Sequence, residues 1–101
     1  MNMQKLMQEA QKMQVQLQKE QKELEKNVYM GKSSLITVEI NGKYEVVSVK
    51  FNSSEMESID TEDLEMLEDM IMVATNDALK KIAEDKNNRM SKYGAGLAGL
   101  M

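Results

Sequence analysis

The spacing of apolar residues changes twice along this chain of 101 residues, and that change decides what the chain can fold into. Over residues 3–28 apolar side chains recur every three or four positions, which is the spacing of a helix with one apolar stripe. Between residues 36 and 51 they alternate with polar residues, as in a strand packed on one face. Helical spacing returns from residue 61. The order predicts an α+β fold with a small antiparallel sheet between two long helices.

The first helix is expected over residues 3–27. It is built from Gln, Lys, Glu, Met and Leu, which are good helix formers, and the chain has no proline that would break it. Glu20 stands where the apolar pattern calls for another apolar residue. The remaining stripe is narrow and heptad-like, typical of a helix that packs lengthwise on another helix or a sheet edge. It consists of Met3, Leu6, Ala10, Met13, Leu17, Leu24 and Val28.

The sequence Asn41-Gly42 is a strong hairpin signal, because a type I′ turn needs positive φ at both central residues. A two-residue loop there pairs Ile40 with Lys43, and therefore Ile36 with Val47. On this register one face of the sheet carries Ile36, Val38, Ile40, Val47, Val49 and Phe51. The other face is not fully polar, because it carries Leu35, Tyr44 and Val46.

The second helix is expected over residues 61–91. Asp60 is suited to its N-cap, and acidic residues in the first turn complement the helix dipole. Its core stripe is predicted to be Leu64, Leu67, Ile71, Ala74, Ala78 and Ile82. We expect one domain over residues 1–93 and a flexible C-terminal tail over residues 94–101, which are rich in glycine.

The two helices are too long for the sheet between them. A helix of about 30 residues spans roughly 45 Å, whereas a three-stranded sheet is about 10 to 15 Å across. The apolar stripes continue past the sheet and need another surface, and a second copy of the chain is the simplest one. The sequence therefore predicts a homodimer, with an interface that includes Leu35, Tyr44, Val46, Met66 and Met70.

Charge is segregated along the chain, although the net charge is only -4. Residues 1–32 hold six Lys and four Glu, residues 55–77 hold nine acids and no base, and residues 78–101 hold five bases and two acids. These are either ordinary solvated faces or two basic ends that converge on an anionic partner. In the second interpretation the contacts come from Lys5, Lys12, Lys19, Lys22, Lys26, Lys80, Lys81, Lys86, Arg89 and Lys92.

Several short segments occur together in a familiar order. They are the Met/Gln/Lys-rich first helix, Ile40-Asn41-Gly42, Glu45-Val46 with Val49, Leu67-Glu68-Asp69 and Asn76-Asp77-Ala78. Over nearly its whole length the chain resembles the YbaB/EbfC family of bacterial nucleoid-associated proteins. The resemblance implies an α-β-β-β-α fold, a tweezer-like homodimer, a first strand at residues 27–31 and DNA binding that is largely or partly independent of sequence. The chain departs from the family pattern at Gly31-Lys32-Ser33-Ser34 and at Asn52-Ser53.

Composition excludes several other functions. The chain has neither Cys nor His, so disulfides, zinc sites of Cys and His, thiol nucleophiles and histidine bases are absent. The acidic segment lacks the alternating ligands and central glycine of an EF-hand loop. We expect no enzyme activity, cofactor, bound metal, small-molecule substrate or membrane partner, and a cytoplasmic, nucleoid location. The alternative function is a protein-interaction module that does not bind DNA directly.

Overall fold

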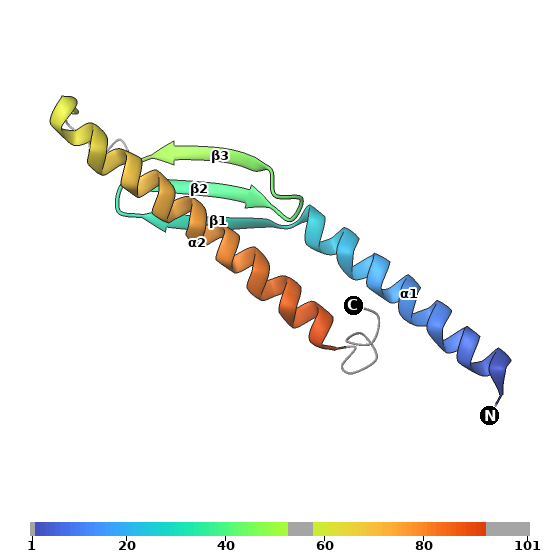
Figure 1. Ribbon diagram of the computed structural model, residues 1–101. Helices are drawn as coiled ribbons and strands as arrows, with labels where there is room; N and C mark the ends of the chain where they lie inside the picture. Colours follow the sequence, from blue (N-terminus) through green and yellow to red (C-terminus); the bar gives the residue numbers. More distant parts are fainter. Residues whose placement is uncertain (1, 53–57, 93–101) are drawn as a thin grey trace.

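The computed structural model describes residues 2–52 and 58–92. It confirms the predicted order of one helix, three antiparallel strands and a second helix (Figure 1). The first strand extends to Ser33, two residues beyond the end that the family resemblance implied. The predicted tail, residues 94–101, lies outside the described residues. The elements are α1 (Met3–Lys26), β1 (Val28–Ser33), β2 (Ile36–Asn41), β3 (Val46–Phe51), the 3-10 turn η2 (Thr61–Asp63) and α2 (Leu64–Ser91).

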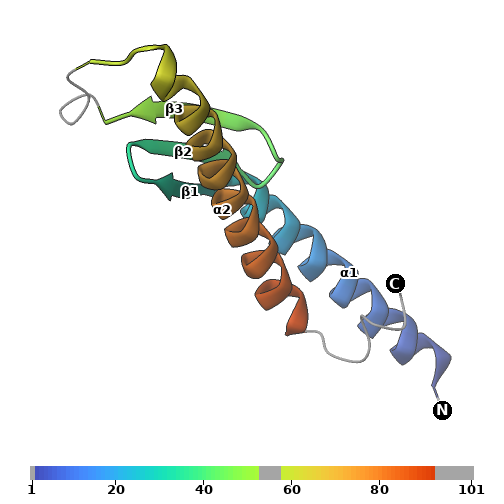
Figure 2. The ribbon, with the colours of Figure 1, turned by 60° about the vertical axis from the view of Figure 1, so that its left-hand side comes forward.

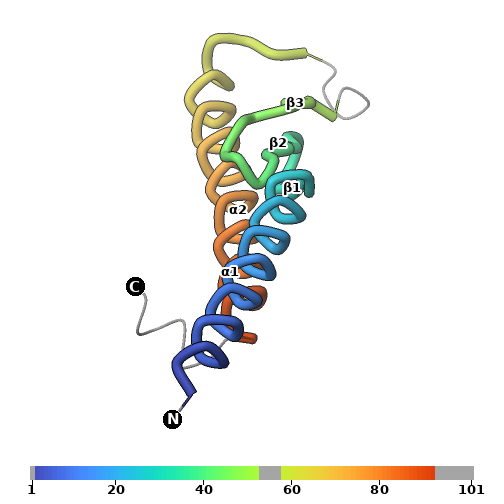
Figure 3. The backbone as a smooth tube through the Cα atoms, turned by 90° about the vertical axis from the view of Figure 1, so that its right-hand side faces the viewer, coloured from blue at the N-terminus to red at the C-terminus, as the bar shows by residue number. Residues whose placement is uncertain are grey.

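The molecule is strongly elongated. Its radius of gyration is 19.9 Å and its extents are 71 × 20 × 15 Å, whereas a compact chain of this length has a radius of gyration of about 13 Å. The helix α1 causes this, because it leaves one corner of the sheet and extends away from it (Figures 1 and 3). Only Leu24, in its last turn, is buried.

The core lies between α2 and one face of β1 and β2 (Figure 2). Ile36, Val38 and Ile40 of β2 point into it at alternate positions. The helix contributes four of the six residues of its predicted stripe, namely Leu67, Ala74, Ala78 and Ile82. Asp60 caps the helical segment as expected, since its side chain accepts from Glu62 N at 2.9 Å and Asp63 Oδ2 accepts from Asp60 N at 3.1 Å.

The backbones of β1 and α2 lie in direct contact at Gly31. A Cβ atom at Gly31 would lie 1.9 Å from the Ala74 carbonyl oxygen and 2.5 Å from the Ala78 nitrogen. No other residue type fits this crossing, because both neighbours are main-chain atoms. Gly31 and the two alanines together let the strand and the helix approach this closely.

The predicted register of the β2–β3 hairpin is wrong. Ile36 lies opposite Phe51, not Val47, and Val38 lies opposite Val49. A bulge follows, so that Ile40 lies opposite Val46. Since residues directly opposite each other share a face, Val46 belongs to the face of Ile40 and not to the other face. The remaining two residues predicted for that other face, Leu35 and Tyr44, lie in loops.

The loop between β2 and β3 explains the error. The backbone nitrogen of Tyr44 donates to the Asn41 carbonyl at 3.0 Å, and Tyr44 itself has the positive φ of 66°. This is a three-residue loop with a left-handed last residue, not a type I′ turn. The Asn41 side chain holds it by accepting from the nitrogens of Lys43 and Glu45, at 2.9 and 3.0 Å. Gly42 is required for space, because a Cβ there would lie 1.9 Å from the Leu24 carbonyl oxygen.

The strand β3 is left uncovered by α2. Val46, Val49 and Phe51 are 55%, 47% and 47% exposed, although they lie opposite buried residues of β2. Two residues of the predicted α2 stripe, Leu64 and Ile71, are also exposed, at 50% and 38%. We call Val46, Val49 and Phe51 the β3 surface. The other face of the sheet is polar at its centre, where Ser48 Oγ donates to Glu39 at 2.8 Å.

Candidate nucleic-acid interface

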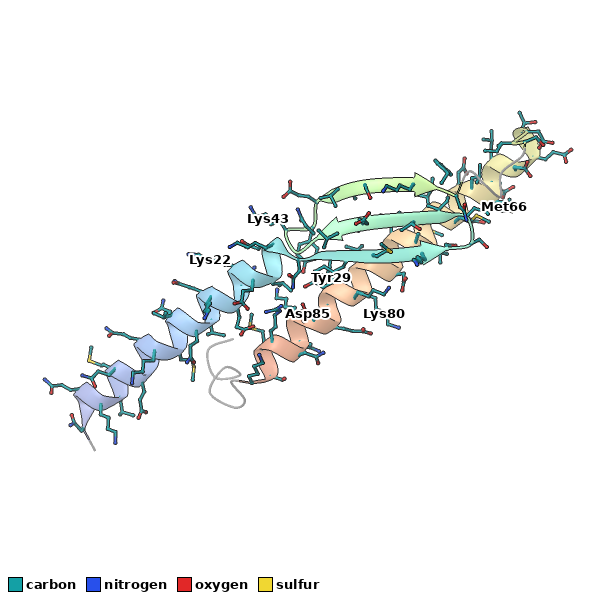
Figure 4. All side chains as sticks on the ribbon, turned by 180° about the vertical axis from the view of Figure 1, so that it is seen from behind. Lys22, Tyr29, Lys43, Met66, Lys80 and Asp85 are labelled. Carbon is teal, nitrogen blue, oxygen red and sulfur yellow. The ribbon has the colours of Figure 1, made fainter. Side chains whose placement is uncertain are left out.

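The lysines of α1 form an open row. Lys5, Lys12, Lys19 and Lys26 recur every seven residues, which places them about 10 Å apart along the axis and within about 20° of one another from each heptad to the next. All four are exposed, as is Lys22 (Figure 4). Within residues 2–52 and 58–92 none of the five forms a salt bridge. We call these five residues the α1 lysine row.

The basic residues of α2 do not form one row. Lys80 is exposed on the side of α2 turned away from the sheet (Figure 4), and Lys86 is also exposed. Lys81 is one position further, about 100° around the helix, and points to β1. Its Nζ donates to the Met30 carbonyl at 2.6 Å and lies 3.6 Å from Asp77 Oδ2.

Lys81 and Asp77 together occupy the outer edge of β1. While Lys81 binds the Met30 carbonyl, Asp77 Oδ2 accepts from the backbone nitrogen of Lys32 at 3.1 Å. These main-chain groups face away from β2, where an additional strand would otherwise pair with them. Lys81 therefore has a structural role in addition to any contact with an anion.

Arg89 lies in a cluster of ion pairs between α2 and α1. Its Nε is 3.1 Å from Asp85 Oδ2, and its Nη1 is 3.0 Å from Glu20 Oε2 and 3.2 Å from Glu23 Oε2. The arginine side chain is only 18% exposed. The Tyr29 hydroxyl of β1 donates to Asp85 (Figure 4). We call these five residues the Arg89 cluster.

The cluster shifts the titration of its own members. The hydrogen bond from Tyr29 and the bond from Arg89 hold the pKa of Asp85 below its usual range. Burial raises the pKa of Tyr29, and its bond to Asp85 adds to this. The bonds to Asp85 and Glu20 raise the pKa of Arg89 further above its already high value. At neutral pH Tyr29 is therefore neutral, whereas Asp85 and Arg89 are charged.

The structure separates the ten predicted contact residues into three groups. The five of α1 lie in one open row, while Lys80 and Lys86 are exposed on α2. Lys81, Arg89 and Lys92 contact carboxylates, and the last places its Nζ 3.6 Å from Glu20 Oε1. In the view of Figure 4, Tyr29 and Asp85 lie between Lys22 and Lys80.

Sequence reasoning did not find the Arg89 cluster. Its one visible signal was Glu20, which interrupts the apolar stripe of the first helix. That interruption is explained by the ion pair with Arg89, 69 residues away in the chain. Within the part of the chain that the structure describes, no group of acidic residues is arranged to hold a metal ion, and no helix is long and apolar enough to cross a membrane.

A small three-stranded sheet, with one helix across its face and another extending from its corner with a lysine row, defines a class of elongated α+β protein. The chain belongs to the YbaB/EbfC DNA-binding family, whose model matches residues 1–97. It is 42% identical to a nucleoid-associated protein of Clostridium novyi, over 96% of this chain and 84% of the relative. It is also 42% identical to a nucleoid-associated protein of Chloroflexus aurantiacus, over 99% of both chains.

The fold has a counterpart among solved structures. The crystal structure of an uncharacterized protein from Helicobacter pylori matches with a TM-score of 0.68, over 87% of this chain and 91% of that one. The two sequences are 23% identical, so this likeness concerns the fold alone. It supports the α-β-β-β-α architecture that the resemblance implied.

Proposed function

We propose that this protein binds double-stranded DNA as a homodimer, mainly through phosphate contacts, in the bacterial nucleoid. The observation that carries the proposal is the α1 lysine row, five exposed ammonium groups without a salt bridge among the described residues. Membership of a DNA-binding family and relatives named nucleoid-associated proteins support the partner and the location.

Lysine suits this task chemically. It is a point charge on a flexible stem, so it meets phosphates without selecting a base. Each phosphate that a lysine neutralises releases counterions, and the affinity therefore falls steeply as salt rises. Arg89 is the chain's single arginine and is already bound to carboxylates, which leaves little scope for bidentate reading of guanine. Binding is therefore largely independent of sequence.

The β3 surface supports the homodimer. It leaves Val46, Val49 and Phe51 half exposed beside an unpaired strand edge, and such a surface is costly to leave in water. A second copy that pairs at β3 covers this surface and doubles the number of lysine rows. Of the residues predicted from sequence for the interface, Val46 lies on this strand, and Met66 is exposed on α2.

A second candidate function is a protein-interaction module. It rests on the free part of α1, where Met3, Leu6 and Met7 are 73%, 45% and 61% exposed. An amphipathic helix with such an apolar stripe also suits a groove on another protein. In this alternative the lysines serve only to keep the helix soluble.

The test is fluorescence anisotropy on two unrelated DNA duplexes at several salt concentrations. We expect binding to both, and a salt slope that decreases by about 0.9 for each phosphate contact removed. A variant with Lys5, Lys12 and Lys19 changed to Gln should lose affinity and slope. The matched control changes three exposed lysines of the sheet region, Lys32, Lys43 and Lys50, to Gln. Sedimentation should show a dimer throughout, whereas a dimer that binds no DNA at low salt would favour the interaction module.

A further inference from the structure

The direction of α1 depends on few contacts. Of its 24 residues only Leu24 is buried, and the salt bridges that join α1 to the rest of the described chain are made by Glu20 and Glu23. Both carboxylates bind the same arginine on α2. Residues 3–17 extend beyond this point (Figure 3). The Arg89 cluster is therefore where the angle between α1 and the rest of the molecule is held.

We propose that Arg89 is a positioning residue for DNA binding: its ion pairs with Glu20 and Glu23 hold the α1 lysine row at a fixed angle to α2 and the sheet. This inference rests on the proposed function. It assigns to Arg89 a role different from the phosphate contact that its position among the C-terminal bases predicts.

A small change in the angle of α1 causes a large displacement at its N-terminal end. Lys5 is 15 residues before Glu20, a distance of about 22 Å along the helix. A tilt of about 10° at the cluster displaces Lys5 by about 4 Å, while successive phosphates of one strand are about 3.4 Å apart along the DNA axis. A small rotation at Arg89 thus shifts the far end of the row by about one phosphate.

The chemistry of the Arg89 cluster is suited to holding α1 at a fixed angle. A guanidinium presents its donors in a planar fork and binds carboxylates from different directions at once, which an ammonium group does less well. Arg89 donates from Nε to Asp85 on its own helix and from Nη1 to the two glutamates of α1. The Tyr29 hydroxyl fixes Asp85 from β1. Three elements are thereby tied to one side chain, which is mostly removed from solvent.

Direct phosphate contact by Arg89 and positioning by Arg89 predict opposite effects of one double variant. In Glu20→Gln with Glu23→Gln the chain loses two negative charges and Arg89 loses both partners on α1. If Arg89 contacts DNA, the freed guanidinium and the added net positive charge raise the affinity. If Arg89 positions the row, the affinity falls although the protein has become more positive.

The experiment measures this double variant beside a matched control. The control, Glu9→Gln with Glu25→Gln, makes the same charge change on α1 outside the cluster. We expect the Glu20/Glu23 variant to bind both duplexes at least about threefold more weakly than wild type, the loss expected when phosphate contacts are broken. The control should bind as tightly as wild type or more tightly. Circular dichroism checks that all variants are folded.

A second measurement reports the angle without DNA. Spin labels at Gln8→Cys on α1 and Asn87→Cys on α2, both exposed positions in a chain without native cysteine, report the distance between the helices. Labelled chains are diluted with unlabelled ones. We expect a narrow distance distribution in wild type and control, and a broader one in the Glu20/Glu23 variant. An unchanged distribution, or an affinity that rises as in the control, would overturn the inference. If wild type binds no DNA, the proposed function fails, while the distance distribution still decides whether Arg89 holds the angle.

Discussion

Replacing Gly31 by Ala should destabilise the protein severely. At an ordinary strand position this change stabilises a protein by about 0.4–1 kcal/mol, because alanine restricts the unfolded chain. Here the added Cβ would lie 1.9 Å from the Ala74 carbonyl oxygen and 2.5 Å from the Ala78 nitrogen. Both atoms belong to the main chain, so no change of rotamer relieves the overlap. The structure therefore predicts that Gly31→Ala lowers the free energy of unfolding, whereas the general rule predicts an increase.

The magnitude follows from the distance that must be restored. Favourable contact needs about 3.5 Å, so β1 and α2 must separate locally by about 1.5 Å. A gap of about 1 Å already forfeits up to half of each dispersion contact, and the packing of Ala74, Ala78 and Ile82 depends on this crossing. We expect a loss of about 3–5 kcal/mol, against a total stability of roughly 5–15 kcal/mol for a chain of this length.

Thermal and urea unfolding, followed by circular dichroism at one fixed protein concentration, measures the effect. The midpoint Tm should fall by about 12 °C or more. Ser33→Ala, on the same strand, is the control and should stay within about 0.5 kcal/mol of wild type. Adding Ala74→Gly should not rescue Gly31→Ala, because the clash is with the main-chain oxygen. A Gly31→Ala protein that unfolds at or above the wild-type temperature would refute the reasoning.

Three further results are expected. Tyr44→Gly should raise the free energy of unfolding by about 1 kcal/mol in urea titrations, because glycine adopts the φ of 66° without strain; a loss would mean that the tyrosine side chain contributes more than its backbone costs. Val49→Lys should convert the proposed dimer to folded monomers in sedimentation experiments, and an unchanged dimer would place the interface elsewhere. The Asp85 pKa is lowered on folding, so its contribution is complete above its ordinary value of 3.8 and is lost as pH falls through the folded pKa. The Tyr29 pKa is raised, so its contribution is complete below 10.0 and is lost as pH rises through the folded pKa. Tyr29→Phe should weaken both pH dependences in unfolding experiments, and profiles identical to wild type would argue against the bond.

The sequence was sufficient to predict those elements that are determined by residues close together in the chain. Apolar spacing identified both helices, and the cap at Asp60 was visible because its partners are within three residues. The hairpin register was not predictable in this way. Gly42 was taken as a residue that permits positive φ, whereas the structure requires it because Leu24 of α1 lies against it. A glycine in the sequence can reflect either a local turn that needs positive φ or a close contact with a distant part of the chain, and the sequence alone does not distinguish the two.

The same distinction applies to the candidate site. The exposure of the α1 lysine row follows from a seven-residue repeat within one helix, so the sequence alone indicates it. The Arg89 cluster joins residues from α1, β1 and α2, and a tally of charge along the chain cannot show which cations are already paired. Arg89 therefore looked like a contact residue for DNA, although its guanidinium faces three carboxylates.

The two edges of the sheet differ in one respect that bears on aggregation. At β1 the outward carbonyl of Met30 and the outward nitrogen of Lys32 are already bound by side chains of α2, whereas no side chain of residues 2–52 and 58–92 covers the outer edge of β3 in this way. Growth of a fibre needs two competent edges on every subunit, so that each addition exposes a fresh one. A sheet with one blocked edge joins one other sheet and then stops. Lys81 and Asp77 thus limit the proposed assembly through β3 to a finite size, because growth cannot continue at β1.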